Sequence, residues 1–167
     1  NHINVIHAIK NLKLKGYDIQ FEMIGHKGEM ENKIKKILNK YDADQKYIKR
    51  IGNLNKKNLI EKIDASEIYL FASSCENLPI TLLEGMSRGK IIISSRKRPM
   101  TDVLGNEGIY FDPENLDEIE SAIIYGIQNH LDNNTKKENL VSLSKQYNWK
   151  STSLKTFQYI NHIYNNN

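Results

Sequence analysis

The sequence predicts an α/β fold with a parallel sheet and helices on both of its faces. Two short β-rich segments, residues 66–71 and 90–95, lie on either side of a helical pattern that begins at Pro79. The second segment, Lys-Ile-Ile-Ile-Ser-Ser, is too short and too rich in β-branched residues for a helix. Proline is favoured at the first helical position, because the N–H there has no partner within the helix. A strand, a loop, a helix and a strand in this order form one parallel crossover.

The chain opens in a helical pattern that ends at Gly16, because glycine readily adopts the left-handed conformation that follows a helix. The apolar residues of this segment fall largely on one helix face: Ile3, Val5, Ile6, Ala8, Ile9 and Leu12. A parallel α/β unit that opens on a helix has lost its first strand. We therefore expect the chain to be a fragment of a longer protein.

Two pairs of a strand and a helix follow this first helix. Residues 17–24 alternate between polar and apolar side chains and then become apolar, which is typical of a strand. The other expected segments are a helix over 29–41, a strand over 47–51 and a helix over 56–64. Gly25 and Gly28 lie where the first strand turns toward its helix.

The last strand is expected at residues 109–111, after a basic loop. Asn115 then follows as a candidate N-cap, with Glu118 three residues further on. This spacing predicts a capping box, in which the Asn side chain takes the place of Ser or Thr. The helix that it opens would bury its isoleucines.

A chain of 167 residues is long enough for one domain with a substantial core. We expect residues 1–167 to form this single domain. Two final helices are expected near 136–146 and 150–164, and the helical pair 136–167 is expected to pack on the rest.

The composition is that of an ordinary globular protein, with 39% hydrophobic and 26% charged residues. A single cysteine excludes a disulfide framework and a cysteine-rich metal site. No run approaches the roughly 18 apolar residues of a transmembrane helix. Residues 1–62 contain fourteen Lys and Arg against seven Asp and Glu. This excess suits an anionic ligand or an anionic membrane surface, or it is a solvated lysine-rich face.

The loop over residues 72–79 is the most informative part of the chain. Ligands of open parallel sheets bind beyond the carboxyl ends of the strands, and the free N–H groups near Ile80 and Thr81 form an anion site there. Glu76 in the loop and Glu84 on the helix flank this site. Ionised carboxylates only accept hydrogen bonds, so they would bind hydroxyl groups around a phosphate. A phosphate flanked by hydroxyls describes a sugar nucleotide.

The sequence around this loop resembles the donor signature of family 4 retaining glycosyltransferases of the GT-B fold. That signature is P-S-x-x-E-G-F-P-L-x-L-L-E-A-M-A-x-G-x-P-V-I-A-S. The chain matches it at Ser73, Glu76, Pro79, Leu82, Leu83, Glu84, Met86, Gly89 and Ser94. It departs at Ala72, Asn77, Leu78, Gly85 and Lys90-Ile91. Asn77 replaces a glycine, and asparagine tolerates a left-handed backbone better than most residues. The resemblance covers nearly the whole chain and implies the Rossmann-like C-terminal half of a GT-B fold.

The resemblance implies a role for each residue of this loop. Glu76 would be catalytic: it would contact hydroxyls of the transferred sugar and help an oxocarbenium-like transition state. Glu84 would bind the ribose hydroxyls. The donor-binding segment between them would be Asn77, Leu78, Pro79, Ile80 and Thr81. The N–H groups of Leu78, Ile80 and Thr81 would stabilise the leaving diphosphate; Pro79 has none.

The resemblance also predicts contacts with the donor at the ends of two other strands. Arg50, Ile51, Gly52 and Asn53 would line the pocket for the nucleotide base. The alternative is a plain strand end at which Gly52 allows the turn. Gly25 matches a G-x-G-type turn of the family loosely, and we expect it to contact the donor; a simple strand-to-helix turn is the alternative.

The family generally works without a metal, so we expect neither a metal nor another cofactor. The expected partners are a nucleotide-diphosphate-sugar donor and an N-terminal, acceptor-binding domain outside this chain, through which the protein would contact a membrane peripherally. We expect no nucleic-acid partner. The whole enzyme would transfer a hexosyl unit to a glycan or lipid-linked acceptor of cell-surface polysaccharide or lipopolysaccharide type. It would act in the cytoplasm, either free or at the inner face of the membrane.

Two alternatives remain open from the sequence. The first is a non-catalytic domain of the same fold that binds nucleotide sugars or serves as a scaffold, against which the intact Glu76 and Glu84 argue. The second is a GT-B sugar-nucleotide epimerase, which needs additional acidic and histidine groups that this chain does not display.

Overall fold

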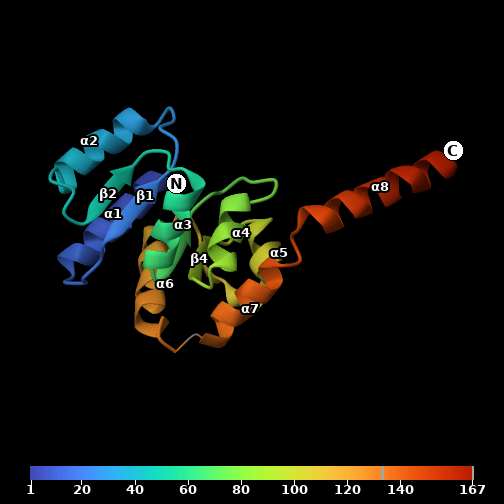
Figure 1. Cartoon of the computed structure of the whole chain (residues 1–167). Coiled ribbons are helices and arrows are strands. Elements are labelled where there is room, and N and C mark those ends of the chain that lie inside the picture. The colour runs from blue at the N-terminus through green and yellow to red at the C-terminus, as the bar shows by residue number, and fades with distance from the viewer. Residues whose placement is uncertain (133, 167) are drawn as a thin grey trace.

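The computed structural model describes residues 1–132 and 134–166 (Figure 1). Its helices are α1 (His2–Leu14), α2 (Glu31–Tyr41), α3 (Lys56–Ala65), α4 (Ile80–Ser87), α5 (Met100–Leu104), α6 (Leu116–Asn129), α7 (Asn134–Ser144) and α8 (Trp149–Asn165). Its strands are β1 (Phe21–Ile24), β2 (Ile48–Ile51), β3 (Ile68–Phe71), β4 (Ile91–Ser95) and β5 (Ile109–Phe111), and the 3₁₀ turn η1 (Gly105–Glu107) precedes β5. The predicted alternation of strands and helices is confirmed.

Every strand pairing within the described residues is parallel. β1 pairs with β2 in one sheet, where Met23 lies opposite Arg50. β3, β4 and β5 form a second sheet in this order, with Leu70 opposite Ile93 and Ile93 opposite Ile109. Parallel strands need a crossover connection, and α4 lies in the connection between β3 and β4. The predicted α/β class with parallel strands is therefore confirmed.

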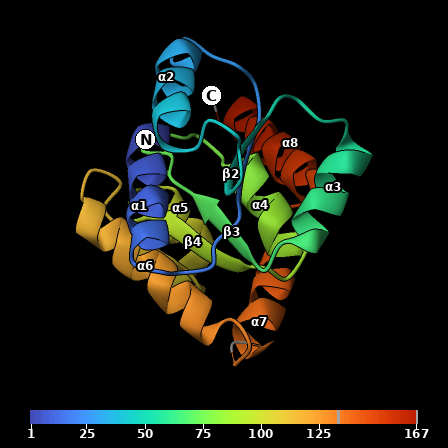
Figure 2. The ribbon, with the colours of Figure 1, turned by 90° about the vertical axis from the view of Figure 1, so that its left-hand side faces the viewer.

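Helices cover both faces of the second sheet (Figure 2). Ile91 and Ile93 of β4 pack in the same cluster as the buried residues of α1 and α6. Ile92, between them, packs with buried residues of α4, α5 and α7, because successive side chains of a strand point to opposite faces. All residues of β4 are buried, as expected for a strand covered on both sides. Each fully buried isoleucine contributes about 1.5–3 kcal/mol of hydrophobic stabilisation.

A gap separates the two sheets. The facing edges of β1 and β3 line the same hollow, and neither edge pairs with another strand of the described chain. Helix α1 packs against both α2 and α6, and its buried Val5, Ile6 and Ile9 join the two halves. A further parallel strand in this gap would complete one continuous sheet.

Two helix starts show how the side chains and turns define the boundaries. α4 begins at Ile80, and Pro79 is its N-cap rather than its first helical residue, because the ψ of 78° at Pro79 is not helical. α6 begins after Asn115, whose side-chain oxygen accepts from N–H groups of the first turn, including that of Glu118. The Glu118 carboxylate accepts from the N–H of Asp112 at 3.0 Å. The predicted cap is therefore present, but Glu118 reaches back past the cap residue.

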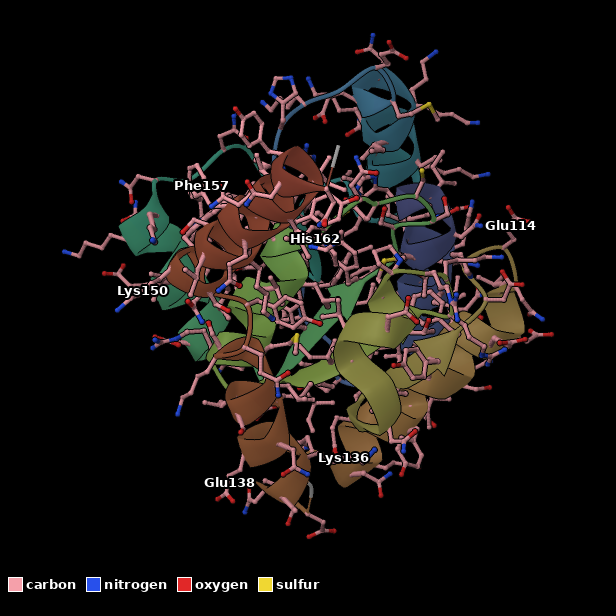
Figure 3. The ribbon with its side chains drawn as sticks, turned by 90° about the vertical axis from the view of Figure 1, so that its right-hand side faces the viewer. Glu114, Lys136, Glu138, Lys150, Phe157 and His162 are labelled. Atoms are coloured by element: carbon pink, nitrogen blue, oxygen red, sulfur yellow. The ribbon has the colours of Figure 1, made fainter. Side chains whose placement is uncertain are left out.

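The last two helices differ in how they contact the domain. Leu140 of α7 is fully buried in the cluster that α4 and α5 form. In contrast, α8 projects away from the body (Figure 1) and has no buried side chain. Figure 3 shows Lys150, Phe157 and His162 along it. Its large exposed apolar residues are Trp149, Leu154, Phe157, Tyr159, Ile160, Ile163 and Tyr164. Of the pair expected over 136–167, only α7 therefore packs on the domain.

Candidate functional site

A cleft of about 1050 Å³ opens at the carboxyl ends of β1 and β3 and continues into the gap between the sheets. Five of the predicted site residues line it: Gly25, Asn53, Glu76, Thr81 and Glu84. They are far apart in the sequence, but parallel strands bring the loops that follow them to the same edge of the fold. This edge is where ligands of parallel α/β proteins bind.

Hydrogen bonds from distant residues fix the first half of the loop between β3 and α4. The Asn1 side-chain amide donates to the carbonyl of Ala72 at 2.8 Å. The hydroxyl of Ser95, at the buried end of β4, donates to the carbonyl of Ser73. The hydroxyl of Ser73 in turn donates to the carbonyl of Cys75 at 3.3 Å. The segment that leads to Glu76 is therefore attached to both α1 and β4.

The start of α4 offers fewer free N–H groups than the sequence suggests. The N–H of Ile80 donates to the carbonyl of Leu78 at 2.9 Å, around Pro79 with φ −78° and ψ 78°. This is an inverse γ-turn, so the N–H of Ile80 is not available to a diphosphate, which corrects the expectation for this residue. The N–H groups of Leu78 and Thr81 donate to no acceptor within residues 1–132 and 134–166. They are the free donors at this helix start.

Glu76 and Glu84 place two free carboxylates beside these donors. Both side chains are half-buried and line the cleft. Neither carboxylate forms a hydrogen bond or an ion pair with another described residue, so Glu84 is not a packing carboxylate bonded to backbone. The positive end of the α4 dipole favours an anion near Thr81. The carboxylates, which only accept, favour hydroxyl groups around that anion.

Arg50 lies outside this cleft, beneath the loop that follows β1. Its guanidinium forms an ion pair with Glu31 at 3.1 Å. It also donates to four backbone carbonyls, those of Met23, Gly25, His26 and Ile51. The guanidinium donors of Arg50 therefore bind the protein itself, and contact of this segment with a nucleotide base stays a prediction. Ile51 and Gly52 also lie outside the cleft lining, whereas Asn53 belongs to it.

The sequence interpretation missed Tyr69, which lines the cleft together with Thr81 and Glu84. Its ring packs directly on α4, where a Cβ added to Gly85 would lie 2.8 Å from the ring Cγ. Burial raises the pKa of the Tyr69 hydroxyl, a hydrogen bond with the Thr81 side chain lowers it and the charge of Glu84 raises it; the net effect is an increase. Gly85 was the available signal, since the family pattern has alanine at this position.

Few positive groups on the cleft wall are free of a partner. Lys62 is paired with Glu22 at 2.8 Å. The pKa of His2 is lowered by burial, by the N-terminal ammonium group and by Arg50, while Glu31 acts in the opposite direction. A neutral His2 is therefore favoured near pH 7. Among the described residues, positive features of the cleft without an ion-pair partner are the α4 N-terminus, Lys49 and the ammonium group of Asn1.

An Asp-x-Asp sequence, Asp42-Ala43-Asp44, occurs in the chain but lies away from the cleft. The Asp42 carboxylate accepts hydrogen bonds from three consecutive backbone N–H groups, those of Lys46, Tyr47 and Ile48. It therefore fixes the turn that leads into β2.

The part of the chain that the structure describes contains no group of three His, Cys, Asp or Glu side chains able to bind a metal ion. None of its helices is both long and apolar enough to cross a membrane.

The fold and the cleft together define a parallel α/β domain in which a helix N-terminus and two unpaired carboxylates line one cleft. The family model described as glycosyl transferases group 1 matches residues 1–145. The chain belongs to this family, and the resemblance stated from the sequence is confirmed.

Known proteins of similar sequence and structure include glycosyltransferases. O-antigen chain mannosyltransferase B of Escherichia coli is 23% identical over 110 residues, which cover 66% of this chain and 29% of that protein. A glycosyltransferase from Rickettsia africae superposes with a TM-score of 0.86 at 20% identity, over 99% of this chain and 45% of the other. Anabaena Alr3699/HepE, solved in complex with UDP and glucose, superposes with a TM-score of 0.80 at 12% identity, over 95% and 44%. The chain thus has their fold and spans less than half the length of each.

Proposed function

We propose that this chain is the donor-binding domain of a retaining glycosyltransferase, which binds a nucleotide-diphosphate sugar and transfers its hexosyl unit. One observation carries this function: the unpaired carboxylates of Glu76 and Glu84 flank the free N–H of Thr81 in a single cleft. A diphosphate bears charge that a helix N-terminus favours, and the ribose and the sugar on either side of it bear hydroxyls that carboxylates bind.

The diphosphate would lie at the start of α4. The N–H groups of Leu78 and Thr81 would donate to its oxygens, and the helix dipole would stabilise the charge that develops as the bond to the sugar breaks. Such stabilisation is large when the donors are already oriented before the reaction. The inverse γ-turn at Pro79 and the bonded Ile80 fix this orientation.

The two carboxylates would then bind opposite ends of the donor. Glu84 lies one turn into α4, on the body of the domain, and would accept hydrogen bonds from the ribose hydroxyls. Glu76 lies in the loop before the helix and would accept hydrogen bonds from hydroxyls of the transferred sugar. Its negative charge would also stabilise the oxocarbenium-like transition state at the anomeric carbon.

The acceptor is proposed from the relatives rather than from the cleft. The name of the Escherichia coli relative refers to an O-antigen chain, which supports an acceptor of cell-surface polysaccharide or lipopolysaccharide type. The two solved relatives described above are more than twice as long as this chain, which supports a second, acceptor-binding domain in the whole enzyme. That domain would bring the enzyme to the cytoplasmic face of a membrane, and no metal would be needed in the donor site.

Isothermal titration calorimetry with UDP, GDP, ADP and their common sugar conjugates tests this function. Glu84→Gln is expected to weaken binding of both the diphosphate and its sugar conjugate about 10-fold or more, since a hydrogen bond to a charged group is lost. Glu76→Gln is expected to weaken the conjugate and to leave the free diphosphate unchanged. Glu114→Gln, an exposed glutamate outside the cleft (Figure 3), is the matched control.

The outcomes separate the competing functions. Equal losses in Glu76→Gln and Glu84→Gln would contradict the division of roles between ribose and sugar. If the wild-type chain binds none of the diphosphates or conjugates, the donor-binding function is wrong and a scaffold domain of the same fold becomes the better interpretation.

A further inference from the structure

We propose that the hydroxyl of Tyr69 also binds the nucleotide sugar. It would donate a hydrogen bond to a ribose hydroxyl, and the same ribose hydroxyl would donate to Glu84. This role rests on the proposed function, because it concerns the same nucleotide. Nothing in the signature of the loop assigns it: Tyr69 lies on β3, ahead of the loop, and reaches the cleft from beneath α4.

The register of β3 directs Tyr69 to this side of the sheet. Ile68 and Leu70 pack in the cluster of α1 and α6, whereas Tyr69 packs in the cluster of α4 and α5. Side chains of a strand alternate between the two faces, so the direction of Tyr69 is determined by the strand rather than by a choice of rotamer alone. The Tyr69 ring therefore lies under the helix whose N-terminus opens into the cleft.

Gly85 determines where the ring lies on that helix. A Cβ at this position would be 2.8 Å from the ring Cγ, 3.0 Å from Cδ1 and 3.1 Å from Cδ2. These three atoms form the Cβ-proximal side of the ring, so this side lies against Gly85. Thr81 is one turn closer to the helix start on the same face, lines the cleft together with Tyr69 and is near enough to the Tyr69 hydroxyl to lower its pKa. The ring thus runs from Gly85 toward Thr81, with its hydroxyl at the ligand end of α4.

The hydroxyl supplies the chemistry that the carboxylates lack. An ionised carboxylate only accepts hydrogen bonds, whereas a phenol can donate one. Each ribose hydroxyl can donate to Glu84 and, through its oxygen lone pairs, accept from Tyr69. Burial raises the pKa of Tyr69, which keeps the phenol protonated at neutral pH and available as a donor. A tyrosine already packed on Gly85 also loses little rotamer freedom when the ligand binds.

Removal of the same hydrogen bond from the protein and from the ligand tests this contact. The protein change is Tyr69→Phe, and the ligand change is the 2′-deoxy or 3′-deoxy form of whichever of UDP, GDP or ADP binds most tightly in calorimetry. Tyr69→Phe is expected to weaken the ribonucleotide about 3- to 10-fold. It is expected to leave the affinity for one of the two deoxynucleotides unchanged, because the partner hydroxyl is already absent.

Tyr110→Phe is the matched control. The ring of Tyr110 also packs on a glycine, with a Cβ at Gly108 2.8 Å from its Cζ. Its hydroxyl donates to the carbonyl of Gly105 at 2.6 Å, and Tyr110 does not line the cleft. Tyr110→Phe should therefore leave nucleotide affinity unchanged. Thermal unfolding of both variants establishes that each is folded before titration.

Three results would overturn the role of Tyr69. The first is an unchanged affinity of Tyr69→Phe for the ribonucleotide. The second is the same loss for the ribonucleotide and for both deoxynucleotides, which would indicate that the residue acts on α4 as a whole. The third is the absence of diphosphate binding by the wild-type chain, which would also overturn the proposed function; the first two results leave that function intact.

Discussion

Arg50 and Glu31 form an ion pair of 3.1 Å in which only 11% and 10% of the two side chains are exposed. The pair joins the start of α2 to the end of β2, and other Arg50 donors bind carbonyls of β1 and of the loop after it. The Glu31 Oε1 atom is buried without a hydrogen-bond partner in the described structure. The buried Glu31 carboxylate therefore depends on Arg50 as its partner, and Arg50 also fixes the backbone around the end of β1.

Arg50→Ala is expected to lower the free energy of unfolding by about 3–5 kcal/mol, because it leaves a buried carboxylate without its partner. Urea denaturation followed by circular dichroism measures this change. Lys57→Ala, which removes one member of the exposed pair with Glu61, should change the same quantity by less than about 1 kcal/mol. If Arg50→Ala leaves the urea midpoint unchanged but abolishes nucleotide binding, Arg50 binds the donor rather than stabilising the fold.

Glu120 is expected to make the stability depend on acid pH. Its side chain is 5% exposed; it forms an ion pair with Lys15 and accepts from the amide of Asn11 at 2.7 Å. Burial raises the pKa of Glu120, but the hydrogen bonds from Lys15 and Asn11 lower the pKa by more than burial raises it. The pKa of Glu120 is therefore below the usual 4.5. The carboxylate therefore stabilises the fold fully above about pH 4.5, and this contribution is lost as the pH falls toward the folded-state pKa.

Urea denaturation at several pH values between about 3 and 6 tests this dependence. Glu120→Gln should be less stable than the wild type near neutral pH, and the difference should shrink on acidification. Glu114→Gln, in an exposed loop, should follow the wild-type curve. A Glu120→Gln difference that stays constant across this range would contradict the assigned titration.

Asp42→Asn is expected to destabilise the turn before β2. The two carboxylate oxygens accept from the N–H groups of Lys46, Tyr47 and Ile48 at 2.8, 2.8 and 2.6 Å. An asparagine side chain has only one acceptor oxygen, and its NH₂ group would face a backbone N–H, which is also a donor. The expected loss is about 1.5–3 kcal/mol in the free energy of unfolding. Asp44→Asn, whose side chain is 74% exposed, should change it by less than about 0.5 kcal/mol.

Gly85→Ala is expected to destabilise the chain although alanine favours helices. The new Cβ would meet the Tyr69 ring at 2.8 Å, and such overpacking costs about 1–3 kcal/mol. Tyr69→Leu in the same chain should recover most of this loss, with a coupling of at least about 1 kcal/mol in a double-mutant cycle. Gly28→Ala, where nothing lies within 4 Å, is the control. Additive losses would show that the two residues do not compete for one space.

Local patterns predicted the central crossover well. The short β-branched run identified β4 to within a residue, and Pro79 did the same for the start of α4. Asn115 was identified as a cap because capping is a local interaction. Glu76 and Glu84 were expected in one site, and they line one cleft. Their roles toward a donor stay predictions, since no ligand contact is observed.

Contacts between distant elements could not be predicted in this way. The burial of Arg50 depends on Glu31 and on carbonyls of a separate strand end, which no periodicity reveals. The engaged N–H of Ile80 depends on the ψ of Pro79, a backbone angle that proline itself does not determine. The contact between Tyr69 and Gly85 depends on how β3 lies under α4. In each case tertiary packing, rather than local preference, decides the role of the residue.

The gap between β1 and β3 has a consequence for amide hydrogen exchange. Backbone groups along the two facing edges form no ladder bonds within the described chain, so local opening there breaks fewer hydrogen bonds than opening of β4, which is paired on both sides. Exchange should therefore be fast on these edges and slow in β4. A strand that occupies the gap in a longer form of the protein would slow exchange in β1 and β3 together, and the rate would report directly on whether the sheet is continuous.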